Sequence, residues 1–266
     1  MTPIADEFER VHEEFAKALL TCRTKADSKA VHRLRKMTRI TEALLRKATG
    51  DHPGAGELHK RAKNALKELK RIRRATGPVR DLDVQKKIAK AMRDSVLTST
   101  MPKDRQLLMR EHASLDARLS RRRGNSQKEL RQLLASHELK LEGALEMTGH
   151  AMRALHARGP GVLVTAKQWV RRIPLPGNDT ESLHDYRKKT KAARYLAGMD
   201  EDSAAARKLA KRLKQMQDAI GEWHDLLLLA EEAKDALGGK AALTLAVKQA
   251  REQARMRAER KIRLNG

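Results

Sequence analysis

Hydrophobic and polar positions recur along this chain with the period of amphipathic α-helices. Good helix formers (Ala, Leu, Lys, Arg, Glu and Gln) dominate, and runs of β-branched residues are absent. Clusters of Gly, Pro, Ser and Asn interrupt the pattern, and each cluster predicts a turn. The predicted helices cover residues 4–21, 29–48, 56–76, 80–97, 103–121, 126–136, 139–157, 162–172, 181–198, 203–220, 223–236 and 240–262.

Each predicted helix carries an apolar face that a core has to cover. Spacings of three and four residues place on these inward faces Leu34, Ile40, Leu44, Leu45, Leu66, Leu69 and Ile72. The four leucines at 226–229 are too many for one face, so that helix is expected to be buried on several sides. The predicted breaks between helices include Gly77-Pro78 and Gly124-Asn125-Ser126.

One basic motif occurs in both halves of the chain. It places basic residues at i, i+3, i+4 and i+7, and its first copy is His32, Arg35, Lys36 and Arg39. The second copy follows 152 residues later (184 − 32) and consists of His184, Arg187, Lys188 and Lys191. This spacing puts four side chains on one helical face, so each copy predicts a cationic stripe. Ser28 and Thr180 precede the two histidines by four residues and are candidate N-caps, where a helix also favours an anion.

The duplication continues downstream at an offset of 144 (221 − 77). The segment from Gly77 to Asp81 matches the segment from Gly221 to Asp225, with Arg80 and His224 in the same place. A further basic row also recurs, as Lys63, Lys67, Lys70 and Arg74 in the first copy and Arg207, Lys211 and Lys214 in the second. Two copies of the same rows suggest that one strongly anionic ligand is contacted twice.

The length of the chain suits two helical bundles. A 20-residue helix is about 30 Å long, and four such helices form a bundle. The basic run Arg121-Arg122-Arg123 marks the predicted seam between a first repeat, 1–123, and a second repeat, 124–266. We therefore expect an all-α fold of two four-helix bundles that arose by internal duplication.

The charge of the chain favours a polyanionic partner. The formal net charge is +24, and a charge of this size opposes compaction unless an anion relieves it. Aromatic residues make up only 2% of the chain, too few for a protein that reads single-stranded nucleic acid by stacking its bases. The composition therefore points to an anion without bases, or to contacts with a nucleic-acid backbone alone.

Other features of the sequence exclude several classes. Cys22 is the only cysteine, which fits a reducing compartment, and no signal peptide or membrane-spanning segment is expected. No phosphate-binding loop, nucleophile elbow or zinc-protease helix is found, and the remaining histidines lack zinc-ligand spacing. We expect a cytoplasmic protein that is not an enzyme and that needs no cofactor or metal.

The paired His-x-x-Arg helices, followed by Gly-x-x-Arg-Asp-Leu-Asp-Val from Gly77 to Val84, resemble the CHAD family of α-helical domains named for a characteristic histidine. The resemblance covers nearly the whole chain. It implies that the two four-helix bundles are pseudo-symmetric and enclose a basic cavity between them. It also implies binding of inorganic polyphosphate without catalysis, often at polyphosphate granules. Phosphate or sulfate ions are further candidate ligands of such a cavity.

The resemblance and the basic rows together define a set of predicted ligand contacts. The predicted polyphosphate-binding residues are His32, Arg35, Lys36, Arg39, Lys63, Lys67, Lys70, Arg74, Arg80, His184, Arg187, Lys188, Lys191, Arg194, Arg207, Lys211, Lys214 and His224. The chain departs from the family pattern at Glu42, where a further arginine is typical, and at Ala192, which replaces a usual basic residue.

Two other functions are left open by the sequence. Net charge alone also permits a protein that binds the backbone of DNA or RNA without regard to sequence. An enzyme that acts on phosphate polymers is the third hypothesis. Competition between polyphosphate and duplex DNA distinguishes the first two, and release of orthophosphate identifies the third.

Overall fold

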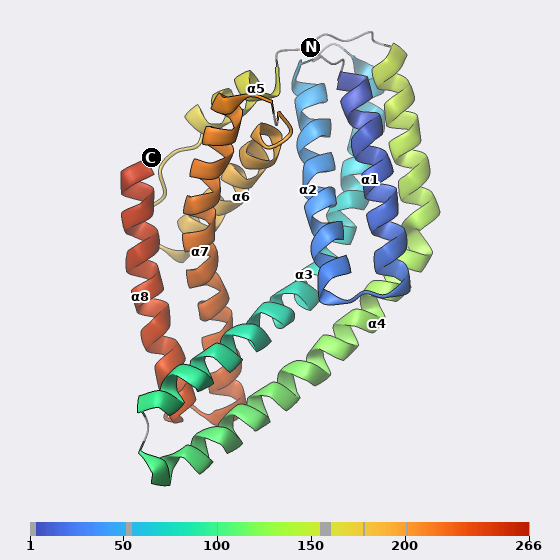
Figure 1. The fold of residues 1–266 in the computed structure, drawn as a ribbon. Coiled ribbons are helices and arrows are strands. Elements are labelled where there is room, and N and C mark those ends of the chain that lie inside the picture. Colours follow the sequence, from blue (N-terminus) through green and yellow to red (C-terminus); the bar gives the residue numbers. More distant parts are fainter. Residues whose placement is uncertain are drawn as a thin grey trace. The chain divides into compact units, whose positions relative to one another are not determined.

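Helices account for the whole regular structure of the residues that the computed structural model describes, which are 4–51, 55–99, 101–154, 161–177, 179–200 and 202–265. The predicted all-α class is therefore confirmed. The helices are α1 (Ile4–Thr24), α2 (Ser28–Asp51), α3 (Gly56–Ser99), α4 (Pro102–Ala154), α5 (Val162–Arg171), α6 (Thr180–Ala197), α7 (Ala204–Leu237) and α8 (Ala242–Asn265) (Figure 1).

Three of these helices join segments that were predicted to be separate helices. α3 continues through Gly77-Pro78, α4 continues through Gly124-Asn125-Ser126, and α7 continues through Gly221, so the predicted breaks at these places are wrong. A proline inside a helix removes one backbone hydrogen bond, and a glycine costs about 1 kcal/mol relative to alanine. Packing along a long helix outweighs costs of this size. The predicted helix end at 157 lies outside the described residues.

The leucines of α4 show why this helix does not break. Its fully buried leucines are Leu115, Leu119, Leu130, Leu134, Leu141 and Leu145. The step from Leu119 to Leu130 is 11 residues, which is close to three helical turns. The apolar face therefore keeps its phase across Gly124, and one continuous helix buries it on both sides of the glycine.

Replacing Gly124 by alanine should stabilise the protein by about 0.5–1 kcal/mol, because alanine is the better helix former and a β-carbon there would meet nothing within 4 Å. Gly143 of α4 is the reference position, since a β-carbon there also meets no atom within 4 Å. Chemical denaturation followed by circular dichroism measures both variants. A gain at Gly143 without a gain at Gly124 would show that residues 124–126 form a loop.

The contacts within the chain divide it into two compact units. The first unit contains Met1–Gly77, Gln127–Pro174 and Lys188–Leu213, and the second contains Pro78–Ser126, Leu175–Arg187 and Lys214–Gly266. Each unit thus takes segments from both halves of the sequence. The division into repeats 1–123 and 124–266 describes the predicted duplication and not the compact units, so it stays a prediction. The pseudo-symmetry of two bundles and a cavity between them also stay predictions.

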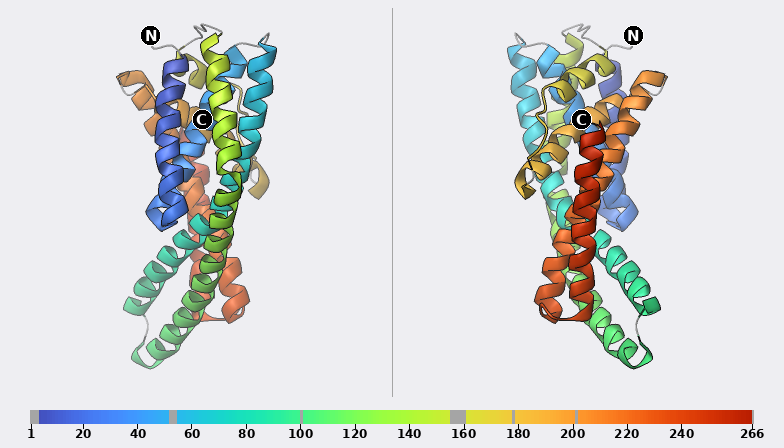
Figure 2. Two further views of the ribbon diagram at one scale, coloured as in Figure 1. Left: turned by 90° about the vertical axis from the view of Figure 1, so that its right-hand side faces the viewer. Right: turned by 90° about the vertical axis from the view of Figure 1, so that its left-hand side faces the viewer.

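The first unit is built around α1, α2, the first part of α3 and the last part of α4, which lie side by side (Figures 1 and 2). Phe8 and Phe15 of α1 are almost completely buried. Of the residues predicted to face inward, those that are buried are Leu34, Leu44, Leu45, Leu69 and Ile72. Ile40 and Leu66 are half-buried. Helical periodicity therefore located most of this core correctly.

The second unit contains the later part of α3, the first part of α4, the later part of α7, and α8. Leu226 and Leu229 are buried, and the two leucines between them are half-buried, in keeping with a helix that is covered on several sides. The Glu111 carboxylate accepts hydrogen bonds from the first backbone amides of α8, at 3.3 Å from Ala242 and 3.0 Å from Leu243. These bonds satisfy amides that have no partner inside the helix.

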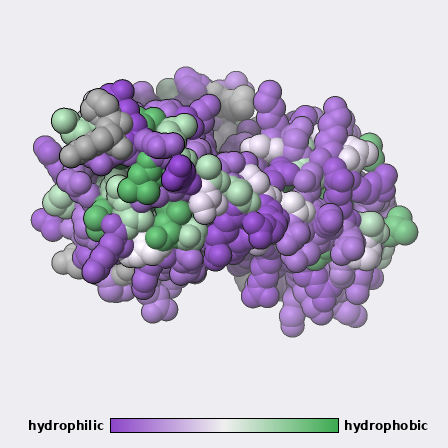
Figure 3. All heavy atoms as spheres, turned by 90° about the horizontal axis from the view of Figure 1, so that it is seen from below, coloured by the Kyte–Doolittle hydropathy of each residue, from purple (hydrophilic) through white to green (hydrophobic). Residues whose placement is uncertain are grey.

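The surface reflects the composition. Viewed from below, hydrophilic residues cover most of the molecule and hydrophobic residues occur in small groups (Figure 3). None of the helices in the described parts of the chain is long and apolar enough to cross a lipid bilayer.

Candidate anion-binding site

A pocket of about 410 Å³ opens in the first unit, between residues of four helices and the segment that follows α5. α2 and α3 supply part of its wall, and α5 and α6 supply the rest. The lining residues are Arg39, Glu42, Ala43, Arg46, Arg73, Trp169, Arg172, Ile173, Lys188, Lys189, Ala192 and Tyr195.

The lining of this pocket is strongly positive. Six of the lining residues are basic and one is acidic, which leaves a formal charge of +5 (6 − 1). Arg46, Arg172, Lys188 and Lys189 are exposed, whereas Arg39 and Arg73 are half-buried. The cations therefore surround an open space with room for an anion.

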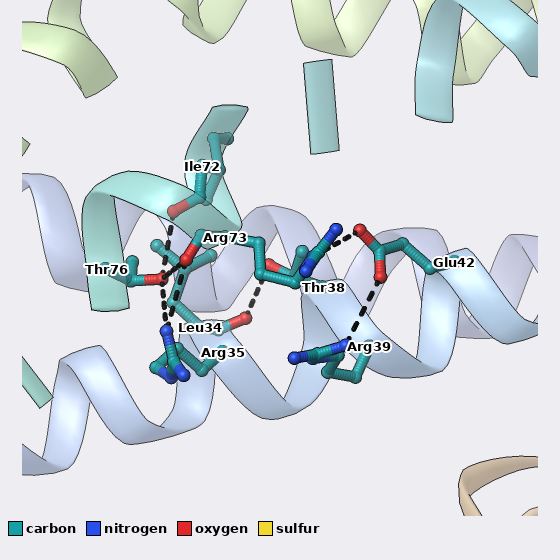
Figure 4. Close-up of polar contacts among 8 residues, drawn as sticks. All are labelled: Leu34, Arg35, Thr38, Arg39, Glu42, Ile72, Arg73 and Thr76. Carbon is teal, nitrogen blue, oxygen red and sulfur yellow. Dashed lines mark hydrogen bonds and ion pairs between the residues drawn. The ribbon is translucent and has the colours of Figure 1, made fainter. Parts of the chain in front are cut away.

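Glu42 fixes the two half-buried arginines. Its carboxylate accepts a hydrogen bond from Nε of Arg73 at 3.0 Å and lies 4.0 Å from Nη1 of Arg39 (Figure 4). Only 8% of Glu42 is exposed, so its carboxylate belongs to the wall of the pocket. A side chain that is already held in place loses less conformational entropy when a ligand binds. Glu42 therefore prepares the two guanidinium groups for an anionic ligand.

The environment of Arg39 leaves it charged at neutral pH. Burial lowers the pKa of Arg39 to about 10, and the nearby Glu42 carboxylate opposes part of this change. A group with this pKa remains protonated near pH 7. Arg39 therefore presents a full positive charge in a place where water screens it less than at the surface.

Arg35 has a different environment from its neighbour Arg39. Its Nη1 donates to the backbone oxygen of Arg73 at 3.1 Å and to Oγ1 of Thr76 at 3.4 Å (Figure 4). Thr76 in turn donates to the backbone oxygen of Ile72 at 2.9 Å. Arg35 thus links α2 to α3 beside the pocket and does not line it.

The histidine stripe of α2 separates into two sides. His32 and Lys36 are exposed, whereas Arg35 and Arg39 are half-buried. The row that leads to the pocket continues from Arg39 to Glu42 and Arg46, at spacings of three and four residues. Of the predicted stripe, only Arg35 and Arg39 lie on the half-buried side of α2 that this row continues.

The two copies of the histidine motif agree in one structural detail. A β-carbon placed on Gly77 would lie 3.5 Å from Nη1 of Arg35, and one placed on Gly221 would lie 3.2 Å from Nη2 of Arg187. The sequence offsets pair these same residues. Each motif arginine therefore lies next to its matched glycine, and the approach is tight at Gly221 and an ordinary van der Waals contact at Gly77.

The pocket brings together two of the predicted contacts, Arg39 and Lys188. Predicted residues of the first unit that do not line it are His32, Arg35, Lys36, Lys63, Lys67, Lys70, Arg74, Lys191, Arg194, Arg207 and Lys211. Those that belong to the second unit are Arg80, His184, Arg187, Lys214 and His224. In that unit the His184 and His224 rings are 4.9 Å apart, and Lys214 pairs with Asp218 at 2.5 Å. Whether these residues contact a ligand stays a prediction.

Sequence reasoning missed four basic residues of the pocket, which are Arg46, Arg73, Arg172 and Lys189. Arg46 follows Arg39 by seven residues, so its helical spacing was a usable signal. Arg73 and Arg172 carry no comparable signal, because the pocket joins segments that are far apart in the sequence.

The fold and this pocket define an all-helical protein with a cationic pocket. A family model described as CHAD domain matches residues 9–234, and the chain belongs to the CHAD family. Among solved structures, it is similar to PptA from Streptomyces chartreusis, with a TM-score of 0.64 and 16% identity over 97% of each chain. At this identity the likeness establishes the fold alone. No curated protein matches the chain.

Proposed function

We propose that this CHAD protein binds inorganic polyphosphate through the cationic pocket of its first unit and does not transform it. The observation that carries the proposal is the pair of arginines, Arg39 and Arg73, held by the buried Glu42 beside four exposed basic residues. Membership of the CHAD family supports the same ligand.

The chemistry of the pocket suits a chain of phosphates. Polyphosphate carries about one negative charge per internal phosphate at neutral pH. The planar guanidinium of arginine bonds two phosphate oxygens at once, and lysine adds a mobile point charge. Fixed arginines with mobile lysines can hold a flexible chain whose phosphates differ in position. The basic rows outside the pocket are candidates for further contacts along a longer chain.

Binding should weaken steeply as the salt concentration rises, because the ligand releases counterions when it meets the basic side chains. For the six basic residues of the pocket, the logarithm of the association constant should fall against the logarithm of salt with a slope of about −4 (0.7 × 6). Isothermal titration calorimetry at several salt concentrations measures this slope. A slope near zero would show that the cations do not contact the ligand.

Competition tests polyphosphate against nucleic acid. Long-chain polyphosphate should displace duplex DNA at equal phosphate concentration, and DNA should displace polyphosphate poorly. The opposite order would favour the nucleic-acid hypothesis. Prolonged incubation with polyphosphate and Mg²⁺ or Mn²⁺ should release no orthophosphate, and sustained release would make the protein an enzyme. In cells, the proposal places the protein in the cytoplasm at polyphosphate granules.

A further inference from the structure

Part of the lining of the cationic pocket is apolar or aromatic. Five of its lining residues are apolar or aromatic, namely Ala43, Trp169, Ile173, Ala192 and Tyr195. Phosphate oxygens gain nothing from contact with aliphatic side chains or with the flat faces of aromatic rings. The pocket therefore combines cationic and apolar lining residues, a combination that fits a ligand with both characters.

Trp169 belongs to this apolar lining and is held by its packing. It packs against a small buried cluster of the first unit that consists of Val162, Ala166, Leu196 and Ala197. The indole is only partly covered by this cluster, and it lines the pocket as well. A flat side chain that is held on one side and open on another is suited to stack against a planar ligand.

Tyr195 adds a second aromatic ring to the lining of the pocket. The guanidinium carbon of Arg194 lies 4.6 Å from the centre of the tyrosine ring, which is the distance of a cation–π contact. This contact holds the ring of Tyr195 in place where it lines the pocket. The chain has only two tryptophans and two tyrosines, and the fold brings one of each to the cationic pocket.

We propose that the pocket also accepts a short oligophosphate attached to a flat aromatic group, the chemistry of a nucleoside triphosphate. The phosphates would meet Arg39 and Arg73, and the aromatic group would lie against Trp169. A volume of about 410 Å³ falls within the range of sites for small molecules. The inference rests on the proposed function only in its use of the same cations.

Intrinsic fluorescence can follow the aromatic contact directly. Trp223 is buried in the second unit, and the substitution Trp223→Phe leaves Trp169 as the sole tryptophan. In this background, metal-free ATP and tripolyphosphate are titrated at equal ionic strength, with calorimetry as the second readout. ATP should change the emission of Trp169 and should bind about tenfold more tightly than tripolyphosphate, because a stacked base contributes about that factor.

Two substitutions of Trp169 distinguish the effect of its flat ring from the effect of its size. Trp169→Leu keeps an apolar side chain on the buried cluster but removes the flat face, and Trp169→Phe keeps a smaller flat face. Trp169→Leu should lower the affinity for ATP about tenfold and change that for tripolyphosphate less than twofold, with Trp169→Phe in between. Circular dichroism verifies that each variant is folded.

The outcomes distinguish this inference from the proposed function. Equal affinities for ATP and tripolyphosphate, both unchanged by Trp169→Leu, would overturn the aromatic contact and leave polyphosphate binding intact. Binding of ATP with loss on Trp169→Leu, but no binding of polyphosphate of any length, would overturn the proposed function and support the aromatic contact.

Discussion

Replacing Arg39 and Arg73 together by glutamine should weaken polyphosphate binding about a hundredfold or more. Each arginine contributes charge-assisted hydrogen bonds, which are worth about 1.5–3 kcal/mol apiece, and two such losses correspond to at least that factor in Kd. Both side chains line the pocket and are held by Glu42, so the ligand meets them without a large cost in entropy. Glutamine is chosen because its amide can still donate a hydrogen bond to the Glu42 carboxylate. Calorimetry at fixed salt measures the effect.

The matched control removes the same charge elsewhere. Lys87 and Lys90 are exposed on α3 and do not line the pocket, so the Lys87→Gln/Lys90→Gln variant should bind less than fivefold more weakly than the wild type. The Arg39→Lys/Arg73→Lys variant retains both charges but loses the planar forks and should fall between the two. If the Arg→Gln pair binds no worse than the control, the pocket is not the polyphosphate site.

Replacing Glu42 by glutamine should lower the free energy of unfolding by about 1–3 kcal/mol, because two half-buried arginines lose their anionic partner. Tripolyphosphate should then stabilise the variant more than it stabilises the wild type. The phosphate takes over as partner of the arginines, and the loss of the repelling carboxylate outweighs the loss of its hold on the two side chains. The measurement is the thermal unfolding midpoint, Tm, with and without tripolyphosphate.

A surface ion pair provides the control for Glu42. Glu57 accepts a hydrogen bond from Arg61 at 2.5 Å on the first turns of α3, and the Glu57 side chain is 60% exposed. Exposed pairs of this kind are worth about 0–1 kcal/mol, so Glu57→Gln should change stability little and should leave the response to tripolyphosphate as in the wild type. Equal ligand responses in the two variants would show that Glu42 does not face the bound anion.

The predicted helices ended too early where the prediction depended on one or two breaker residues. Gly77-Pro78 and Gly124 are usual breakers, and each predicted a turn. The buried leucines on both sides of Gly124 were in phase, and that long-range regularity predicts the continuous α4 correctly. A glycine inside a helix costs about 1 kcal/mol and a proline about 3 kcal/mol, whereas each fully buried leucine contributes about 1.5–3 kcal/mol and several lie on each long helix. Phase over several turns is therefore the stronger signal.

The sequence by itself determined the class and the family of this protein. Helical periodicity depends on neighbours three and four residues apart, so it identified the all-α fold and most inward positions of α2, such as Leu34 and Leu44. The paired His-x-x-Arg helices and the Gly-x-x-Arg-Asp-Leu-Asp-Val motif that follows the first of them identified a CHAD domain. Charge and composition required only counting, and they pointed to a polyanion.

Only the tertiary structure decided which cations share a pocket. Helical spacing places His32 and Arg39 on neighbouring parts of one surface, but it cannot tell which of them meets α3, α5 and α6. The neighbouring helices leave His32 in solvent and enclose Arg39 with Trp169 and Lys188, residues more than 120 positions away. Contacts over such separations depend on how whole helices pack, because packing, rather than spacing within one helix, determines which side chains are removed from water together.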